Sequence, residues 1–338
     1  MPQLTHGSRV VAHDDGLSGS RGAVRYVATV MEPPNIPRFL RDTATRALGS
    51  GRHEAVIDRG WWIERGPNGG YLAAIVLRAM LAEVADAARA PRTLTVHYLA
   101  LPHEGPIEVV VVIERAGRGL STVSARVVQD DVLVGMALAA FAKTRPGDGF
   151  DDQVPPPELA AGPQSVPVRT AEAPIPLAER FETRPVFGGE PFRGGQEALA
   201  GGWIRLAQPV PVDEVVVAAL TDAWFPAVFN RVDSFVAVPT IELTIHFRHQ
   251  VADLGAETHC FVRFRSRTAV DGFVEEEGEV WSPGGLVLAQ SSQLAAYIPC
   301  PHKIPELGVR SSRSRGVLPG NTVAGHGRSP IAQRPRPS

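Results

Sequence analysis

Three polar side chains in the second half of the chain could together activate a water molecule. Asp222 follows a run of apolar residues, Thr240 opens the segment VPTIELTIHF, and Gln293 lies in the segment LVLAQSSQLAAYI. A carboxylate, a hydroxyl and an amide can hold one water between them, and the carboxylate can take up its proton as a general base. These three residues are therefore our candidate catalytic groups.

Each of the three also has a purely structural interpretation. Asp222 could cap a kink before Pro226, because proline removes a helical hydrogen bond. Thr240 is β-branched and suits a strand. Gln293 could face solvent, since Gln290, Ser291 and Ser292 make the same segment polar.

A different feature in the first half is the sequence Asn68-Gly69-Gly70-Tyr71, which precedes a long apolar run. Asn68 is a favourable helix N-cap. Paired glycines at a helix start let a ligand approach the free backbone N–H groups, which together with the helix dipole can stabilise an oxyanion. The alternative is an ordinary glycine-rich turn.

The two halves of the chain repeat one another. The segment LTVHY at 94–98 matches LTIHF at 243–247, which is 149 residues later, and the last apolar segments of the two halves end in AAF at 139–141 and AAY at 295–297. Two copies of a unit this long indicate duplication of a domain rather than a solenoid.

Duplication provides an internal control, because a polar residue at a core position of one copy alone is a candidate for chemistry. At the 149-residue offset Asp222 corresponds to Ala73, and Gln293 aligns with Ala137 when the segment ends are matched. Where Thr240 opens its strand, the first copy has Pro91-Arg92.

Both copies show the same order of predicted elements: a short strand, an apolar helix, then several strands with alternating β-branched residues. The segments are 53–64, 70–87, 106–115 and 122–129 in the first copy, and 202–207 and 212–229 in the second. The first helix is apolar nearly all round, so it has to be wrapped by other elements. A curled antiparallel sheet around one long helix is the hotdog arrangement, so the sequence predicts an α+β fold with two hotdogs in tandem.

In the predicted second helix, spacing places Asp222 on one face with Val215, Ala218 and Ala219. That face is apolar, so we expect the carboxylate to point into the core or into a pocket. Burial of an unpartnered charge there would cost several kcal/mol, so Asp222 needs partners.

The predicted domains are an N-terminal hotdog at 45–145 and a C-terminal hotdog at 178–299, which carries the catalytic groups. Residues 146–177 hold many prolines, which favours a linker. We expect an irregular or disordered segment at 1–44 and a disordered basic tail at 300–338.

Composition excludes some classes of protein. The net charge of −2 argues against nucleic-acid binding driven by bulk charge. The two cysteines, Cys260 and Cys300, form neither a disulfide framework nor a metal-binding pattern, so we expect a reducing cytoplasm and no metal or other cofactor. The first residues of the chain include no apolar signal-peptide core. The longest apolar stretch in the whole sequence is too short to span a membrane.

The chain resembles the acyl-CoA thioesterase II family of double-hotdog enzymes over roughly 50–145 and 180–299. In the first half the resemblance rests on the paired glycines, TLTVHYLALP and STVSARVVQDDVLV; in the second it rests on FETRPV, GWIRLA, ALTDAWFP, PTIELTIHFR and LAQSSQLAAYI. Many members have Gly-Gly-Gln where this chain has Gly69-Gly70-Tyr71, and the motif around Thr240 matches loosely.

The resemblance implies hydrolysis of a fatty acyl-CoA to a free fatty acid and CoA. The family's water-binding triad falls on Asp222, Thr240 and Gln293, and backbone N–H groups near Gly69–Tyr71 would stabilise the oxyanion. We expect the acyl tail to run along Trp224, Phe225 and Phe229. Candidates to bind CoA phosphates are Arg248, Arg263 and Arg265, although exposed strand charges explain these arginines equally well.

Hotdog sheets commonly pair, so we expect a homo-oligomer. Two other functions stay open: a non-catalytic protein that binds acyl-CoA or lipid, and a hydratase or dehydratase. The second needs a catalytic histidine with an acidic partner. His97 and His246 recur in both copies, which favours a structural role for them.

Overall fold

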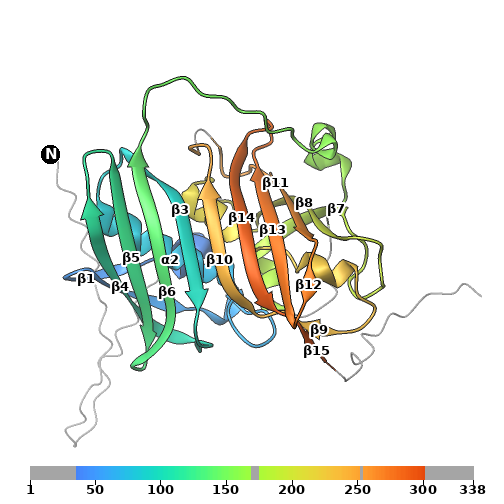
Figure 1. Cartoon of the computed structure of the whole chain (residues 1–338), viewed down its shortest axis with the longest axis horizontal. Coiled ribbons are helices and arrows are strands. Elements are labelled where there is room, and N and C mark those ends of the chain that lie inside the picture. Colours follow the sequence, from blue (N-terminus) through green and yellow to red (C-terminus); the bar gives the residue numbers. More distant parts are fainter. Residues whose placement is uncertain (1–35, 169–174, 252–253, 301–338) are drawn as a thin grey trace, which may run out of the picture.

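The computed structural model describes residues 36–168, 175–251 and 254–300. Within them the main feature is one long antiparallel sheet with the two longer helices on one of its faces (Figure 1). The predicted α+β class with antiparallel strands is therefore confirmed. The predicted basic tail lies outside the described residues, apart from Cys300.

The first half supplies six strands, which pair in the order β1-β2-β4-β5-β6-β3. Their bounds are β1 Arg46–Gly49, β2 Arg52–Ile57, β3 Arg89–Tyr98, β4 Gly105–Ala116, β5 Leu120–Gln129 and β6 Val132–Lys143. Inward and outward residues alternate along β5, as expected for strands with one face against a core.

The second half continues the same sheet in the order β10-β14-β13-β11-β8-β7. The bounds are β7 Phe181–Phe187, β8 Ala198–Leu206, β10 Thr240–Phe247, β11 Cys260–Ser266, β13 Phe273–Trp281 and β14 Val287–Ala296. Of three short strands, β12 Ala269–Val270 pairs with β13, whereas β9 Val236–Ala237 and β15 Ile298–Pro299 form a separate two-stranded sheet.

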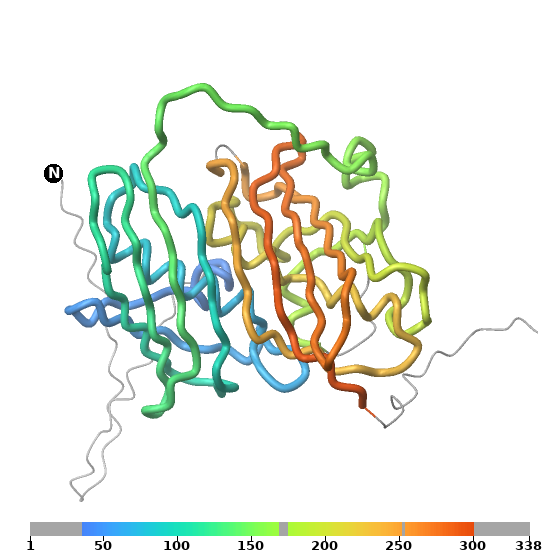
Figure 2. Tube along the Cα trace, viewed as in Figure 1, coloured from blue at the N-terminus to red at the C-terminus, as the bar shows by residue number. Residues whose placement is uncertain are grey.

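The halves join where β3 pairs with β10, and these strands contain the two copies of the repeat found in the sequence. Thr95 and Thr244, which are equivalent in the repeat, are partners in the antiparallel register, and their hydroxyl oxygens lie 2.8 Å apart. Equivalent residues that face one another across the junction place a local pseudo-two-fold axis between them. Figure 2 shows the two halves side by side around it.

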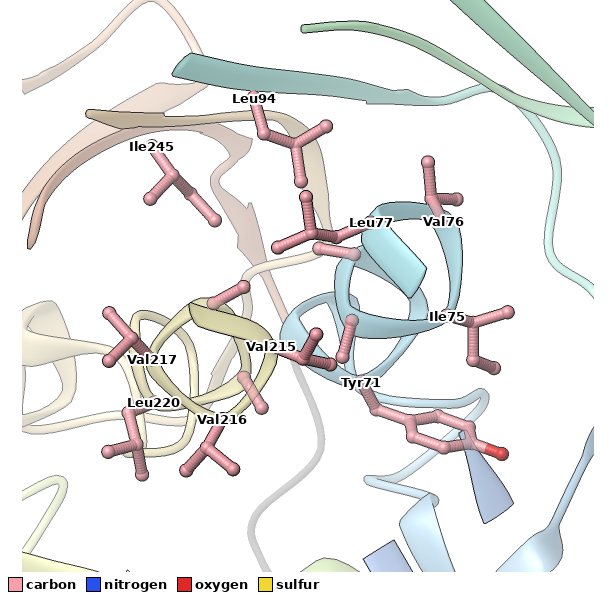
Figure 3. Close-up of a cluster of buried hydrophobic side chains, with 14 of the residues drawn as sticks. Tyr71, Ile75, Val76, Leu77, Leu94, Val215, Val216, Val217, Leu220 and Ile245 are labelled. Carbon is pink, nitrogen blue, oxygen red and sulfur yellow. The ribbon is translucent and has the colours of Figure 1, made fainter. Parts of the chain in front are cut away.

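Helix α2, Gly69–Val84, forms the core of the first half. The Asn68 side chain caps it by accepting from the N–H of Tyr71, and Ala85 ends it in the left-handed region. Most of its residues are buried, as its apolar sequence requires. Figure 3 shows Leu77 of α2 pointing toward Leu94 of β3, with Val215 of the second helix between the two helices.

The second helix is much shorter than predicted. Helix α3 covers only Glu214–Leu220, and the prediction of one helix over 212–229 is wrong. The Asp213 side chain caps its start, and the Thr221 side chain bonds back to the Ala218 carbonyl at its end. Pro226 cannot continue the helix, and a separate 3-10 turn, η5 Ala227–Asn230, follows it.

Segments predicted to be irregular are partly ordered. Helix α1, Arg38–Asp42, buries Phe39 against Trp61 of the 3-10 turn η1, Arg59–Trp61. The predicted linker contains two more 3-10 turns, η2 Pro157–Ala161 and η3 Pro163–Ser165, and a third, η4 Pro176–Arg180, begins at its end. Leu159 packs there against the outer face of the sheet, beside Trp203 and Trp281.

Candidate active site

The Asp222 carboxylate lies where the two helices meet. It follows the end of α3, and its Oδ2 accepts hydrogen bonds from the Gly70 backbone N–H and from Asn68 Nδ2, each at 2.9 Å. Asn68 Nδ2 also donates to the Asp222 backbone carbonyl at 2.6 Å. Two residues of the first half, Asn68 and Gly70, therefore bind the side chain and the backbone of Asp222, the candidate base, which belongs to the second half.

Gln293 and Thr240 complete a chain of hydrogen bonds on the inner side of the sheet. Gln293 Nε2 on β14 donates to Asp222 Oδ1 at 3.0 Å, and Thr240 Oγ1 at the start of β10 donates to Gln293 Oε1 at 3.0 Å. Gln293 is buried with 6% exposure, which rules out the solvent-facing interpretation. The three candidate catalytic residues are thus brought together.

Burial raises the pKa of Asp222 from its usual value to about 6. Hydrogen bonds from the Gly70 and Gly69 backbones and from the Gln293 and Asn68 amides oppose this rise, because they stabilise the charged form. Asp222 is therefore ionised at neutral pH, but it is a stronger base than an exposed aspartate. A general base works best with a pKa near the operating pH.

The helices approach closely here, which requires glycine at position 70 and leaves little room for a side chain at position 69. A Cβ on Gly70 would lie 2.7 Å from the Ala219 carbonyl oxygen and 3.0 Å from Asp222 Cβ. A Cβ on Gly69 would lie 3.0 Å from both Asp222 Oδ2 and the Tyr98 hydroxyl oxygen. The pair thus lets α2 and the end of α3 meet.

The expected role of the Gly69–Tyr71 N–H groups has to be revised. The Gly70 N–H is bonded to Asp222, and the Tyr71 N–H is bonded to Asn68 Oδ1 at 2.9 Å, so neither is free to receive a carbonyl oxygen. The Tyr71 side chain is fully buried, and its hydroxyl donates to the Asp42 carbonyl. Tyr71 is therefore part of the core, and the helix start serves the carboxylate.

Two further residues lie at the site that the sequence did not lead us to predict. The Tyr98 hydroxyl donates to the Gly69 carbonyl at 2.8 Å, and burial followed by the charge of Asp222 raises the pKa of Tyr98. Its equivalent in the repeat is Phe247, so comparison of the copies could have revealed a hydroxyl in one copy only. Glu276 on β13 is the second, and it lies opposite Gln293 in the strand register.

The three aromatic residues expected to line an acyl pocket do not form one wall. Trp224 belongs to the main core, and its ring centroid lies 6.3 Å from that of Phe225. Phe229 packs in a separate cluster, against Phe192.

An apolar pocket lies instead beside α2. It is a small pocket between the helix and the sheet of the first half. Its wall includes Leu72, Val76, Val96, Tyr98, Ile107 and Val134. Tyr98 is common to this pocket and to the surroundings of Asp222.

The three arginines proposed to bind phosphates lie away from these residues. Arg263 pairs with Glu279. Arg263 and Arg265 both lie on the face of β11 opposite Phe264, which is the outer side of the sheet. Arg248 bonds to Gln290 beyond the far end of β10, eight residues from Thr240, or roughly 26 Å along a strand. Their simpler interpretation as exposed strand charges fits these positions.

The histidines of the repeat also face away from the site. His97 is exposed on β3, whereas its neighbours Val96 and Tyr98 point to the inner side of the sheet. An acidic residue, Glu242, is its register partner on β10. Across the described ranges, no group of three or more metal-ligating side chains is present. No helix there is long and apolar enough to cross a membrane.

Comparisons with solved structures agree on the fold. A conserved protein with a hot dog fold from Alicyclobacillus acidocaldarius is 27% identical, with a TM-score of 0.68 over 77% of this chain and 97% of that one. A putative thioesterase II from Thermobifida fusca is 22% identical, with a TM-score of 0.65 over 78% and 98%. The acyl-CoA thioesterase II TesB2 from Mycobacterium marinum is 18% identical, with a TM-score of 0.62 over 78% and 99%.

Family models are more specific than these structures. A search of curated proteins returned no match to this chain. However, the model of the acyl-CoA thioesterase N-terminal domain matches residues 58–142, and that of the C-terminal domain matches 151–297. Together they cover more than half of the chain and the elements that meet at Asp222, and the chain belongs to the acyl-CoA thioesterase family with these two domains.

Proposed function

We propose that this protein hydrolyses fatty acyl-CoA to a free fatty acid and CoA, with Asp222 as the general base. The observation that carries the proposal is the hydrogen-bonded chain from Thr240 through Gln293 to Asp222. The family supports thioester hydrolysis in general; the acyl-CoA substrate and the roles of the three residues are our inference.

In this mechanism a water bound by the three side chains gives one proton to Asp222 as its oxygen attacks the thioester carbon. The carbonyl oxygen becomes an oxyanion in the tetrahedral intermediate. The intermediate collapses, the carbon–sulfur bond breaks, and the CoA thiolate takes the proton back from Asp222. Acid and thiol leave together, and no redox step is needed.

Helix α2 assists this chemistry through its position. Its N-terminus carries a partial positive charge, and it meets Asp222 through Gly70 and Asn68. This field keeps the half-buried carboxylate charged and favours the negative charge of the transition state. Asn68 and Gly70 are therefore positioning residues for the base.

The acyl tail would enter the apolar pocket beside α2. Tyr98 contacts both regions: its hydroxyl reaches Gly69 next to Asp222, and its side chain lines the pocket with Leu72 and Val76. A thioester held near Asp222 would then direct its tail along Leu72 into the first half of the chain.

The predicted organisation extends this proposal. Two hotdogs in tandem, at 45–145 and 178–299 with a linker between them, would place the reactive groups of the second against the helix of the first. A cytoplasmic homo-oligomer remains our expectation. A hydratase is less well supported, because His97 and Glu242 share the outer face of the sheet rather than the site.

The decisive experiment measures thiol release from acyl-CoA substrates of increasing length, for the wild type and for Asp222→Asn. Loss of a general base typically lowers the rate about 10²–10⁴-fold. Asp148→Asn makes the same change at an exposed site and should keep full activity. A wild-type protein that binds acyl-CoA but releases no thiol would instead be a non-catalytic binder, and full activity of a folded Asp222→Asn would exclude Asp222 as the base.

A further inference from the structure

A second carboxyl group, that of Glu276, lies on the inner face of the sheet close to Asp222. Glu276 on β13 is the register partner of Gln293 on β14, and Gln293 donates to Asp222. Residues 274, 278 and 280 of the same strand are buried, and Glu276 shares their two-residue spacing, so its side chain faces inward with them. It is thus one strand away from the hydrogen-bonded chain of the site.

Glu276 also holds the segment that carries the base. Its Oε2 accepts a hydrogen bond of 2.5 Å from the Ala227 backbone N–H, the first residue of the turn η5. Only four residues lie between Asp222 and Ala227, and they include Pro226. Asp222 is therefore fixed on one side by Asn68 and Gly70, and Glu276 anchors the chain on the other side.

Few charged groups act on Glu276. Asp222 comes from the segment after α3, and Glu275 comes from its own strand. The neighbouring strand β14 presents the uncharged Gln293 and Ser291, and β11 presents Phe264, whose ring lies beside Gly278. Within the part of the chain that the structure describes, no cation acts on Glu276, whereas Glu277 and Glu279 on the outer face are paired with Arg267 and Arg263.

Burial, and then the negative charge of Asp222, raise the pKa of Glu276 to about 8. At neutral pH the site therefore holds one ionised and one protonated carboxyl. Negative charges on both Asp222 and Glu276 would repel each other. The proton therefore stays on Glu276, which accepts fewer hydrogen bonds than Asp222. Four groups donate hydrogen bonds to Asp222, namely the Gly69 and Gly70 backbones and the Asn68 and Gln293 amides, whereas Glu276 accepts one from Ala227.

We propose that Glu276 is a positioning residue of the reaction: it is a neutral acid while Asp222 acts as the base, and its ionisation slows the reaction. This inference rests on the proposed hydrolysis at Asp222. The physical reason is that hydrolysis builds an oxyanion, and a second negative charge beside Asp222 opposes that charge. The rate should therefore fall at alkaline pH, by about tenfold for a charge acting through the protein interior.

The first test is the pH profile of kcat/KM for thiol release between pH 5 and 9.5, corrected for spontaneous hydrolysis. The wild type should show a fall above pH 8, and Glu276→Gln, which is neutral and can still accept from Ala227, should not. Glu277→Gln makes the same change on the outer face and should keep the fall. A circular-dichroism spectrum that is unchanged between pH 7 and pH 9.5 excludes unfolding as its cause. An alkaline fall that persists in Glu276→Gln, or a wild type without one, overturns the proposal.

The second test needs no activity. Carboxyl carbon shifts of labelled glutamates, with the Glu276 signal assigned by its loss in Glu276→Gln, give the pKa of Glu276 directly. The pKa should be well above that of the other glutamates, and it should fall in Asp222→Asn because the neighbouring charge is gone. An ordinary pKa, or one that does not respond to Asp222→Asn, overturns the coupling, and it does so whether or not the protein proves to be a thioesterase.

Discussion

The backbone N–H of Gly70 donates to Asp222 Oδ2 across the contact between α2 and the end of α3. One helix start in the first half thus stabilises the carboxylate of the second half. Neither half contains the whole site, because Asn68 and Gly70 come from one, and Thr240 and Gln293 from the other. Duplication followed by divergence would explain why only one of two related positions keeps the reactive groups.

Gly70→Ala should reduce activity strongly. The added Cβ would lie 2.7 Å from the Ala219 carbonyl, which is backbone and cannot move aside cheaply, so the helices must separate and the bond to Asp222 must lengthen. We expect kcat to fall at least about tenfold, since a hydrogen bond to a charged group is worth about 1.5–3 kcal/mol. Gly119→Ala is the matched control, because nothing lies within 4 Å of a Cβ there. Equal activities of the two variants would contradict the proposed role.

Thr240→Val tests the hydroxyl of the triad while keeping the shape of the side chain. The variant loses the bond to Gln293 Oε1 and one ligand of the attacking water, so kcat should fall by about tenfold. Thr95→Val removes a hydroxyl from the outer side of the same sheet and should leave kcat unchanged. If both variants kept wild-type kcat, Thr240 would have only the β-branched structural role.

The acid side of the pH profile should report Asp222. Its raised pKa of about 6 means that the base is protonated, and inactive, below that pH. The rate kcat/KM should therefore rise tenfold per pH unit up to about pH 6 and then level off. In Asp222→Asn the small residual rate should lose this dependence. A wild-type profile that levels off near pH 4 would show that the carboxylate is not desolvated as the structure indicates.

Much of the fold was predictable because it depends on local patterns and on the repeat. The alternation of β-branched residues located β4 and β5 to within two residues at each end, and the Asn68 cap located the start of α2. The length of α3 was missed, because an apolar run with a helical period does not reveal where side chains such as Thr221 satisfy the helix end. Propensity alone cannot decide between a continued helix and a turn at such a point.

The site was predictable only in part, and for a physical reason. Comparison of the copies finds polar residues that replace apolar ones, so it found Asp222 and Gln293. It cannot find contacts that depend on packing between the halves, such as the N–H of Gly70 that bonds to Asp222. Glu276 stands within the run Glu275–Glu277, where the sequence gives no sign that one of three glutamates faces inward.

Substitutions at Leu72 should change the preference for acyl length. Leu72 lines the apolar pocket and comes two residues after Gly70 in the chain. Leu72→Trp should therefore shorten the path of the acyl tail, and Leu72→Ala should lengthen it. We expect kcat/KM to move toward shorter and longer acyl-CoA substrates respectively, by about tenfold for each removed or added pair of methylenes. Leu294→Ala changes an exposed leucine of the outer face and serves as the control. An unchanged length profile in both Leu72 variants would place the tail elsewhere.

Stability should depend on pH through Glu276, and the sign follows from its raised pKa. The folded protein keeps this proton up to about pH 8, whereas the unfolded chain releases it near the ordinary value of 4.5. The contribution to stability is therefore full below pH 4.5, and it is lost as the pH rises toward 8. Glu276→Gln cannot lose it, so its free energy of unfolding relative to the wild type should increase by roughly 3 kcal/mol between pH 4.5 and pH 9. Urea unfolding at these two pH values measures the change, with Glu277→Gln as the exposed counterpart. A difference between Glu276→Gln and the wild type that stays constant with pH would mean that Glu276 ionises as easily in the folded protein as in the unfolded chain.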